Sequence, residues 1–144
     1  MASRALRVAA IDLGKARAGV AVADELGAMA HARPFVDARD RRALLAALAA
    51  FAKEERLERF VVGLPLEMHG AEGPAARRAR VFAQELADAT GLEIELVDER
   101  LSTVEAARRL REGGTSARRG KAKIDGASAA VLLQAWLDAR DRRG

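Results

Sequence analysis

Four carboxylate residues stand where predicted elements of secondary structure begin or end. Asp12 closes the first apolar segment and Asp125 opens the final predicted helix. Asp98 and Glu99 close the last predicted strand. If the fold brings these groups together, they need cations to offset their repulsion. A cluster of oxygen ligands without His or Cys favours Mg²⁺ or Mn²⁺.

Each of these residues also has an ordinary structural interpretation. Asp12 is compatible with a simple turn residue, and Asp125 with a helix N-cap. Glu99 is compatible with an ion pair to Arg100. Only their convergence in space would favour the catalytic interpretation.

Two divalent ions about 4 Å apart can activate water and stabilise the leaving oxygen when a phosphodiester bond is cleaved. Gly14 permits close approach of a phosphate to the turn that follows Asp12. Residues 113–123 are expected to form a basic loop that holds a substrate backbone near Asp125. Its cations are Arg118, Arg119, Lys121 and Lys123. These features together predict a metal-dependent nuclease.

Other catalytic chemistries find little support in the residues. The chain has no cysteine, which excludes disulfides, thiolate nucleophiles, zinc fingers and iron–sulfur sites. It has neither a Gly-x-Ser-x-Gly nucleophile elbow nor a Gly-x-x-x-x-Gly-Lys-Ser/Thr phosphate loop. His31 lies in a predicted edge strand and His69 in a predicted surface loop.

The charge of the 144-residue chain is concentrated near its C-terminus. Its 25 Lys and Arg against 21 Asp and Glu give a net charge of +4. Residues 101–144 contribute 10 basic and 5 acidic side chains, a net charge of +5, and the first hundred residues contribute −1. A polyanionic partner is one explanation, because Arg grips phosphate through paired hydrogen bonds. A genome rich in Arg codons is the other.

The elements that must position these residues follow from apolar periodicity and turn signals. We predict a meander of three strands at 6–12, 18–24 and 27–36, the third at an edge because it contains Pro34. A helix at 40–55, a strand at 60–64, a helix from Pro74 to Gly91 and a strand at 93–98 come next. A short helix is predicted at 102–111 and a final helix at 124–137, followed by a frayed, charged tail from Asp138.

The order of these elements predicts one three-layer α/β domain over residues 1–144. Strand–helix–strand crossovers force parallel pairing, so the sheet has five strands, is mixed, and carries helices on both faces. Ligands of such sheets gather at the carboxyl ends of the parallel strands. We find neither a membrane span nor a signal peptide, and therefore expect a soluble cytoplasmic protein.

Six ordered motifs along nearly the whole chain resemble the YqgF (RuvX) family. They are Ile11-Asp12-Leu13-Gly14, the run from Arg17 to Val22, Val62-Gly63-Leu64-Pro65-Leu66, Gly70-x-Glu72-Gly73-Pro74, Val97-Asp98-Glu99-Arg100-Leu101-Ser102-Thr103, and Ile124-Asp125 with Ala129-Ala130 and Leu133-Gln134. The resemblance implies a ribonuclease H-like fold and a nuclease that matures the 5′ end of 16S ribosomal RNA. It also implies a relation to Holliday junction resolvases.

The resemblance also assigns roles to individual residues. Asp12, Glu99 and Asp125 would be the catalytic metal ligands, and Asp98 is expected on the opposite face of its strand from Glu99. Residues expected to orient the site or contact the substrate are Gly14, Arg17, Arg100, Thr103, Arg118, Arg119, Lys121 and Lys123. The turn carries Lys15-Ala16-Arg17 where the family usually has Lys-Arg together. Glu67 and His69 stand where Asn and Asp are frequent.

The sequence leaves three functions open. The first is a Mg²⁺- or Mn²⁺-dependent endonuclease acting on precursor 16S rRNA, with the ribosomal particle as a further partner. The second is a resolvase of branched DNA, which would need a homodimer to make two symmetric cuts. The third is a non-catalytic nucleic-acid-binding factor of ribosome assembly. An actin-like ATPase shares the Asp-x-Gly hairpin but needs a much longer chain. No membrane partner is expected, and a monomer and a homodimer are both compatible with the sequence.

Overall fold

A five-stranded mixed sheet organises the molecule. The computed structural model describes residues 6–101 and 124–143, with side chains of the last helix described over 128–140. The strands are β1 (Val8–Leu13), β2 (Arg17–Ala23), β3 (Ala30–Asp37), β4 (Arg59–Leu64) and β5 (Glu93–Asp98). Their order is β3-β2-β1-β4-β5, with β1–β2 and β2–β3 antiparallel and β1–β4 and β4–β5 parallel. The predicted meander and parallel crossovers are therefore confirmed.

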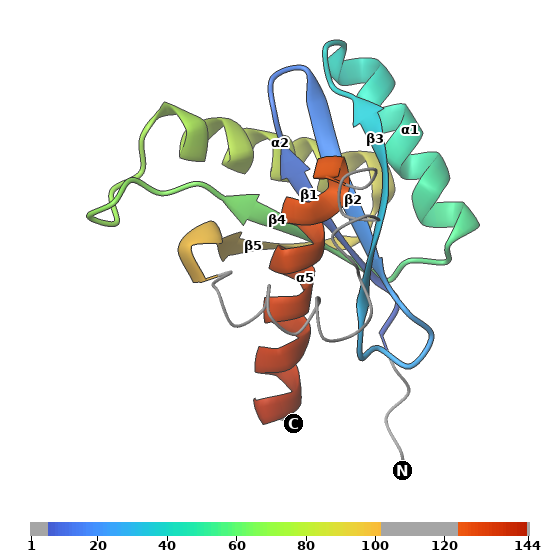
Figure 1. Cartoon of the computed structure of the whole chain (residues 1–144). Coiled ribbons are helices and arrows are strands. Elements are labelled where there is room, and N and C mark those ends of the chain that lie inside the picture. The colour runs from blue at the N-terminus through green and yellow to red at the C-terminus, as the bar shows by residue number, and fades with distance from the viewer. Residues whose placement is uncertain (1–5, 102–123, 144) are drawn as a thin grey trace.

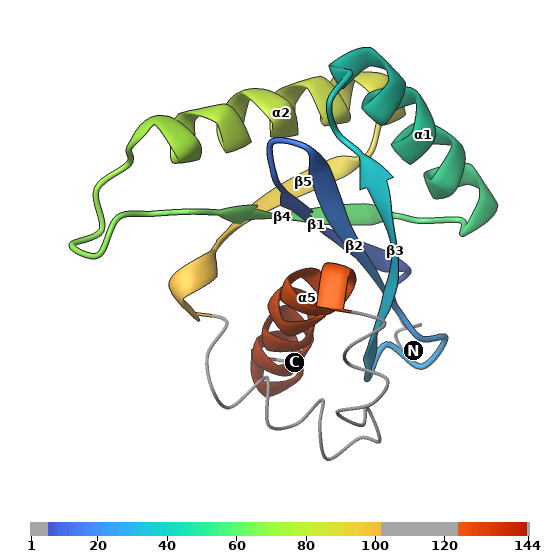
Figure 2. The ribbon, with the colours of Figure 1, turned by 45° about the horizontal axis from the view of Figure 1, so that its top comes forward.

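Helices cover both faces of the sheet (Figures 1 and 2). Helices α1 (Arg41–Glu54) and α2 (Pro74–Thr90) pack on one face, and α5 (Ile124–Arg143) packs on the other. A single 3₁₀ turn, η1 (Glu99–Leu101), follows β5 directly. None of the helices in the described part of the chain is long and apolar enough to cross a membrane.

Local sequence signals set the helix ends. The Asp40 side chain caps α1 by accepting a hydrogen bond from the Ala43 N–H. Pro74 occupies the first turn of α2, where its missing N–H is not needed. Gly91 ends the same helix in the left-handed conformation, with φ of 72°.

Alternating side chains divide the core into two layers. Val8 and Ala10 of β1 face α5, whereas Ala9 and Ile11 face α1 and α2. Small residues on the α5 side of β1 and β2 let that helix approach the sheet closely. The side chain of Gln134 is fully buried there; it accepts a hydrogen bond from the Ala30 N–H and donates one to the Ala28 carbonyl.

The predicted frayed tail from Asp138 is wrong, because α5 continues to Arg143. Side-chain contacts within the helix support this extension. Gln134 donates a hydrogen bond to Asp138, and the Arg140 guanidinium lies 5.7 Å from the centre of the Trp136 ring. The predicted helix 102–111 and the basic loop 113–123 lie outside the described residues.

Candidate active site

The carboxyl ends of the central strands bring Asp12 and Glu99 together. Strands β1 and β5 both pair with β4, with Ile11 opposite Val62 and Val97 opposite Gly63. Asp12, which follows Ile11, and Glu99, which follows the end of β5, therefore reach the same edge of the sheet. Because side chains alternate along each strand, Asp12 falls on the α5 face with Val8 and Ala10. A hydrogen bond joins the Asp12 and Glu99 carboxyl groups.

Gly63 of β4 leaves the space that the Glu99 side chain occupies. A Cβ atom at Gly63 would lie 2.4 Å from Glu99 Oε1 and 2.9 Å from its Cγ. Sequence reasoning assigned no role to this residue. Its signal is a glycine inside an otherwise apolar strand, which often marks the close approach of another group.

The carboxyl pair is electrostatically strained. Burial, the hydrogen bond with Asp12 and repulsion from Asp12 and Asp98 raise the pKa of Glu99 from 4.5 to about 7. Glu99 therefore keeps its proton at a pH well above the usual range of a glutamate side chain. Such a pair is a candidate site for a cation that would take the place of this proton.

Asp98 has a different task from Glu99. It accepts hydrogen bonds from the Arg100 backbone N–H at 2.9 Å and from Arg100 Nη2 at 2.8 Å, and this pairing lowers its pKa. Arg100 Nη1 also donates to the Met68 carbonyl at 3.2 Å. Arg100 thus ties the loop between β4 and α2 to the end of β5, beside the carboxyl pair.

The β1–β2 turn is closed by Gly14 and exposes Arg17. The Gly14 N–H donates to the Arg17 carbonyl at 2.9 Å, and a Cβ at Gly14 would lie 2.6 Å from that oxygen. The glycine is therefore required by the turn itself, in addition to any approach of a phosphate. The Arg17 guanidinium stacks 4.3 Å from the centre of the Phe35 ring.

The third predicted ligand is placed by its backbone alone. Asp125 is the second residue of α5, the helix that covers the face carrying Asp12. Figure 1 shows α5 beginning at the end of the sheet where β1 ends. Within the described residues no three acidic or histidine side chains form a metal-binding group. The three-ligand site remains a prediction, and Thr103, Arg118, Arg119, Lys121 and Lys123 lie outside the described residues.

The residues present fit a hard divalent cation. Asp12 and Glu99 offer carboxylate oxygens, which Mg²⁺ and Mn²⁺ prefer. A divalent ion held by these residues would favour loss of the Glu99 proton and offset the repulsion between the carboxylates. The open carboxyl edge of the sheet is the usual ligand site of an α/β fold.

This architecture is the ribonuclease H-like fold, which two solved resolvase structures share. RuvC of Thermus thermophilus in complex with a Holliday junction substrate superposes with a TM-score of 0.65 at 17% identity, over 95% of this chain and 96% of RuvC. The fowlpox virus resolvase in complex with a junction gives a TM-score of 0.57 at 9% identity, over 94% and 99%. The predicted fold class is confirmed.

The chain belongs to the RuvX family, whose sequence model is described as a Holliday junction resolvase and matches residues 6–139. A relative from Anaeromyxobacter sp. strain Fw109-5 is 52% identical over 94% of this chain and 98% of its own length. One from Myxococcus xanthus is 46% identical over 93% and 89%. Both carry a name that describes them, provisionally, as pre-16S rRNA nucleases.

The raised pKa of Glu99 predicts a stability that depends on pH. The folded chain binds this proton more tightly than the unfolded chain, so metal-free protein loses stability as the pH rises from about 4.5 to about 7. The loss should be about 1 to 2 kcal/mol, since solvent screens a half-exposed group. Glu99→Gln should remove this loss, measured by urea unfolding in EDTA at pH 5 and pH 8. Glu54→Gln, on the exposed end of α1, is the control; equal pH dependence in all three proteins would contradict the assignment.

Gly63 is predicted to set the position of the Glu99 carboxyl. Gly63→Ala should push this flexible side chain away from Asp12 and return its pKa toward 4.5, with the fold retained. The measurement is an NMR titration of the Glu99 side-chain carboxyl carbon in both proteins. Far-UV circular dichroism controls for folding. A Glu99 pKa unchanged by the extra methyl group would show that Gly63 plays no such part.

Proposed function

We propose that this chain is a divalent-metal-dependent endonuclease that hydrolyses phosphodiester bonds in structured nucleic acid, with precursor 16S rRNA as its substrate. The hydrogen-bonded Asp12–Glu99 pair at the carboxyl ends of β1 and β5, the two strands that flank β4, carries the proposal. Membership of the RuvX family supports it independently.

The chain contributes the ligands and the shape of the site. Asp12 and Glu99 would hold the metal, and Asp125 in the first turn of α5 would complete the ligand set. When bound, Mg²⁺ or Mn²⁺ supplies an activated water and neutralises charge on the phosphate. Gly63 keeps space for Glu99, and the Asp98–Arg100–Met68 link holds the neighbouring loop in place.

The choice of RNA as substrate depends on the relatives. Those at 52% and 46% identity are named for pre-16S rRNA. The description of the family model and the junction complex of RuvC favour a second candidate, a resolvase of branched DNA. A resolvase needs two symmetric cuts and hence a dimer, whereas cleavage of a single RNA strand needs one site.

The direct test is cleavage of two labelled substrates side by side. A precursor 16S rRNA fragment that spans the mature 5′ end and a synthetic four-way DNA junction are incubated with Mn²⁺, Mg²⁺ or EDTA. We expect cleavage of the RNA that depends on metal. Asp12→Asn should slow it about 100-fold or more, because removing a metal ligand costs several kcal/mol of transition-state stabilisation.

Asp88→Asn is the matched control, since Asp88 lies exposed on α2 and accepts one hydrogen bond from Gln84. It should cleave like the wild type. Cutting of the junction alone would establish the resolvase. Binding of both substrates without cleavage would leave the non-catalytic ribosome-assembly factor, and full activity of Asp12→Asn would remove the proposed site.

A further inference from the structure

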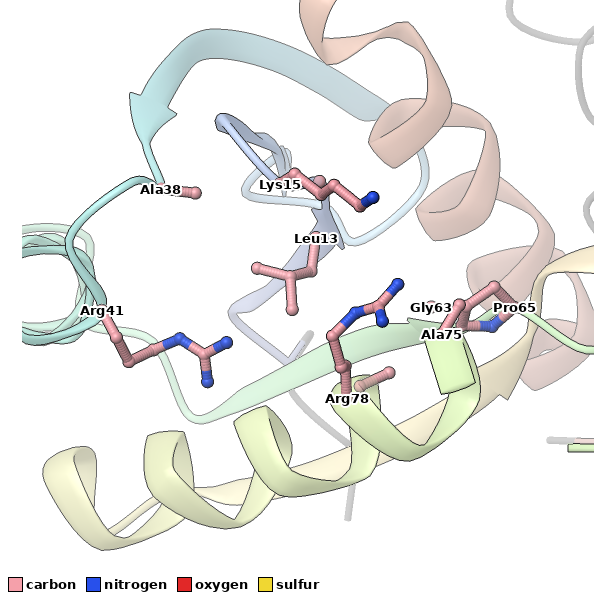
Figure 3. A pocket seen from close by; sticks show the side chains of 10 residues that line it. Leu13, Lys15, Ala38, Arg41, Gly63, Pro65, Ala75 and Arg78 are labelled. Carbon is pink, nitrogen blue, oxygen red and sulfur yellow. The ribbon is translucent and has the colours of Figure 1, made fainter. Parts of the chain in front are cut away.

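A basic pocket lies on the other face of the sheet from the carboxyl pair (Figure 3). Its volume is about 320 Å³, and it is enclosed by the β1–β2 turn, the start of α1 and the first turns of α2. Three elements each contribute one cation: Lys15 from the turn, Arg41 from α1 and Arg78 from α2. In Figure 3 Arg78 extends from α2 toward the turn that carries Lys15.

The pocket has a marked excess of positive charge. None of the described residues that line it is acidic. Arg41 is paired with Glu85 and lies over the Phe82 ring, but Lys15 and Arg78 make no ion pair within the described part of the chain. Two unpaired cations that face one hollow repel each other, and an anion between them would relieve that repulsion.

The positive surface continues along α2. A second hollow of about 320 Å³ shares Arg41 and Arg78 with the first and adds Arg77. Both hollows have apolar walls; the first includes Leu13 and Ala79, and the second Val81. Cations beside apolar walls suit a sugar–phosphate backbone, whose phosphates proteins contact largely through Arg and Lys.

The pocket and the carboxyl pair are connected through β4. The backbone of Gly63 lines the pocket, and the Glu99 side chain occupies the space that a Cβ atom at Gly63 would fill. Leu13, which lines the pocket, directly follows Asp12. A nucleic-acid strand that crosses the carboxyl ends of β1 and β4 would therefore contact the carboxyl pair and the pocket in succession.

We propose that the Lys15–Arg41–Arg78 pocket binds a backbone phosphate of the nucleic-acid substrate next to the scissile bond. This inference rests on the proposed function for its ligand. The pocket holds the strand in register, so that the scissile phosphate lies at the carboxyl pair. Lys15 and Arg78 are positioning residues, because they contact a phosphate that does not react.

The test compares two double variants that each remove one Lys and one Arg. Lys15→Gln/Arg78→Gln alters the pocket. Lys53→Gln/Arg56→Gln alters exposed cations at the far end of α1, before β4 begins. Both are made in the Asp12→Asn background, and binding of a fluorescent RNA oligonucleotide is followed by anisotropy at several salt concentrations.

The pocket variant should bind about tenfold more weakly, and its salt slope should fall by about one for each phosphate that the protein no longer neutralises. With an intact Asp12 it should raise KM and leave kcat nearly unchanged. The control pair should alter neither the slope nor KM. Equal weakening in the two variants would mean that only total charge matters, and would overturn the inference.

A series of oligonucleotides, each with one neutral methylphosphonate linkage at a different position, shows which phosphate the pocket binds. At one linkage the neutral group should weaken binding by the wild-type pocket and have no effect on the pocket variant, which lacks the cations that would bind that phosphate. Identical profiles for both proteins would refute the pocket. If the wild type cleaves RNA and the pocket variant binds RNA as tightly as its parent, this inference alone is refuted. If the pocket variant binds RNA more weakly but the wild type does not cleave it, only the proposed function is refuted.

Discussion

The repulsion between two carboxyl groups held side by side governs the chemistry available at the carboxyl edge of the sheet. Asp12 and Glu99 are 87 positions apart in the chain and share a hydrogen bond because β1, β4 and β5 are parallel neighbours with a fixed register. Their repulsion and burial oppose folding at neutral pH. The proposed metal-binding role would account for this cost, because a divalent ion bound by the two groups would replace their repulsion with attraction.

The two faces of the sheet carry groups of opposite charge at its carboxyl edge. The α5 face carries the carboxyl pair, and the opposite face carries the cations between the β1–β2 turn, α1 and α2. Gly63 is common to both, since its backbone lines the pocket and its missing side chain admits Glu99. The proposed catalytic site and the proposed phosphate-binding pocket therefore adjoin at Gly63.

The sequence predicted the three-stranded meander and the parallel crossovers of a five-stranded mixed sheet, because apolar runs and turn residues mark the strands and their connections. It also singled out Asp12 and Glu99 as groups that would meet where strands end. It did not predict Gly63 or the basic pocket. Gly63 acts through an absent side chain, which leaves only a glycine in an apolar strand. Lys15, Arg41 and Arg78 come from three separated elements, so no local spacing relates them. The helical tail after Asp138 was missed because its support comes from Gln134 and Trp136 one turn earlier.

The central claim is that Asp12, Glu99 and Asp125 together bind a divalent ion. Titration of the protein with Mn²⁺, with the free ion counted by electron paramagnetic resonance, tests this without any substrate. The wild type should bind Mn²⁺ saturably at pH 8. Asp12→Asn or Asp125→Asn should each weaken it about tenfold or more, the effect typical of disturbing a metal site. Equal Mn²⁺ uptake by all three proteins would show that Asp12 and Asp125 are not ligands of a divalent ion.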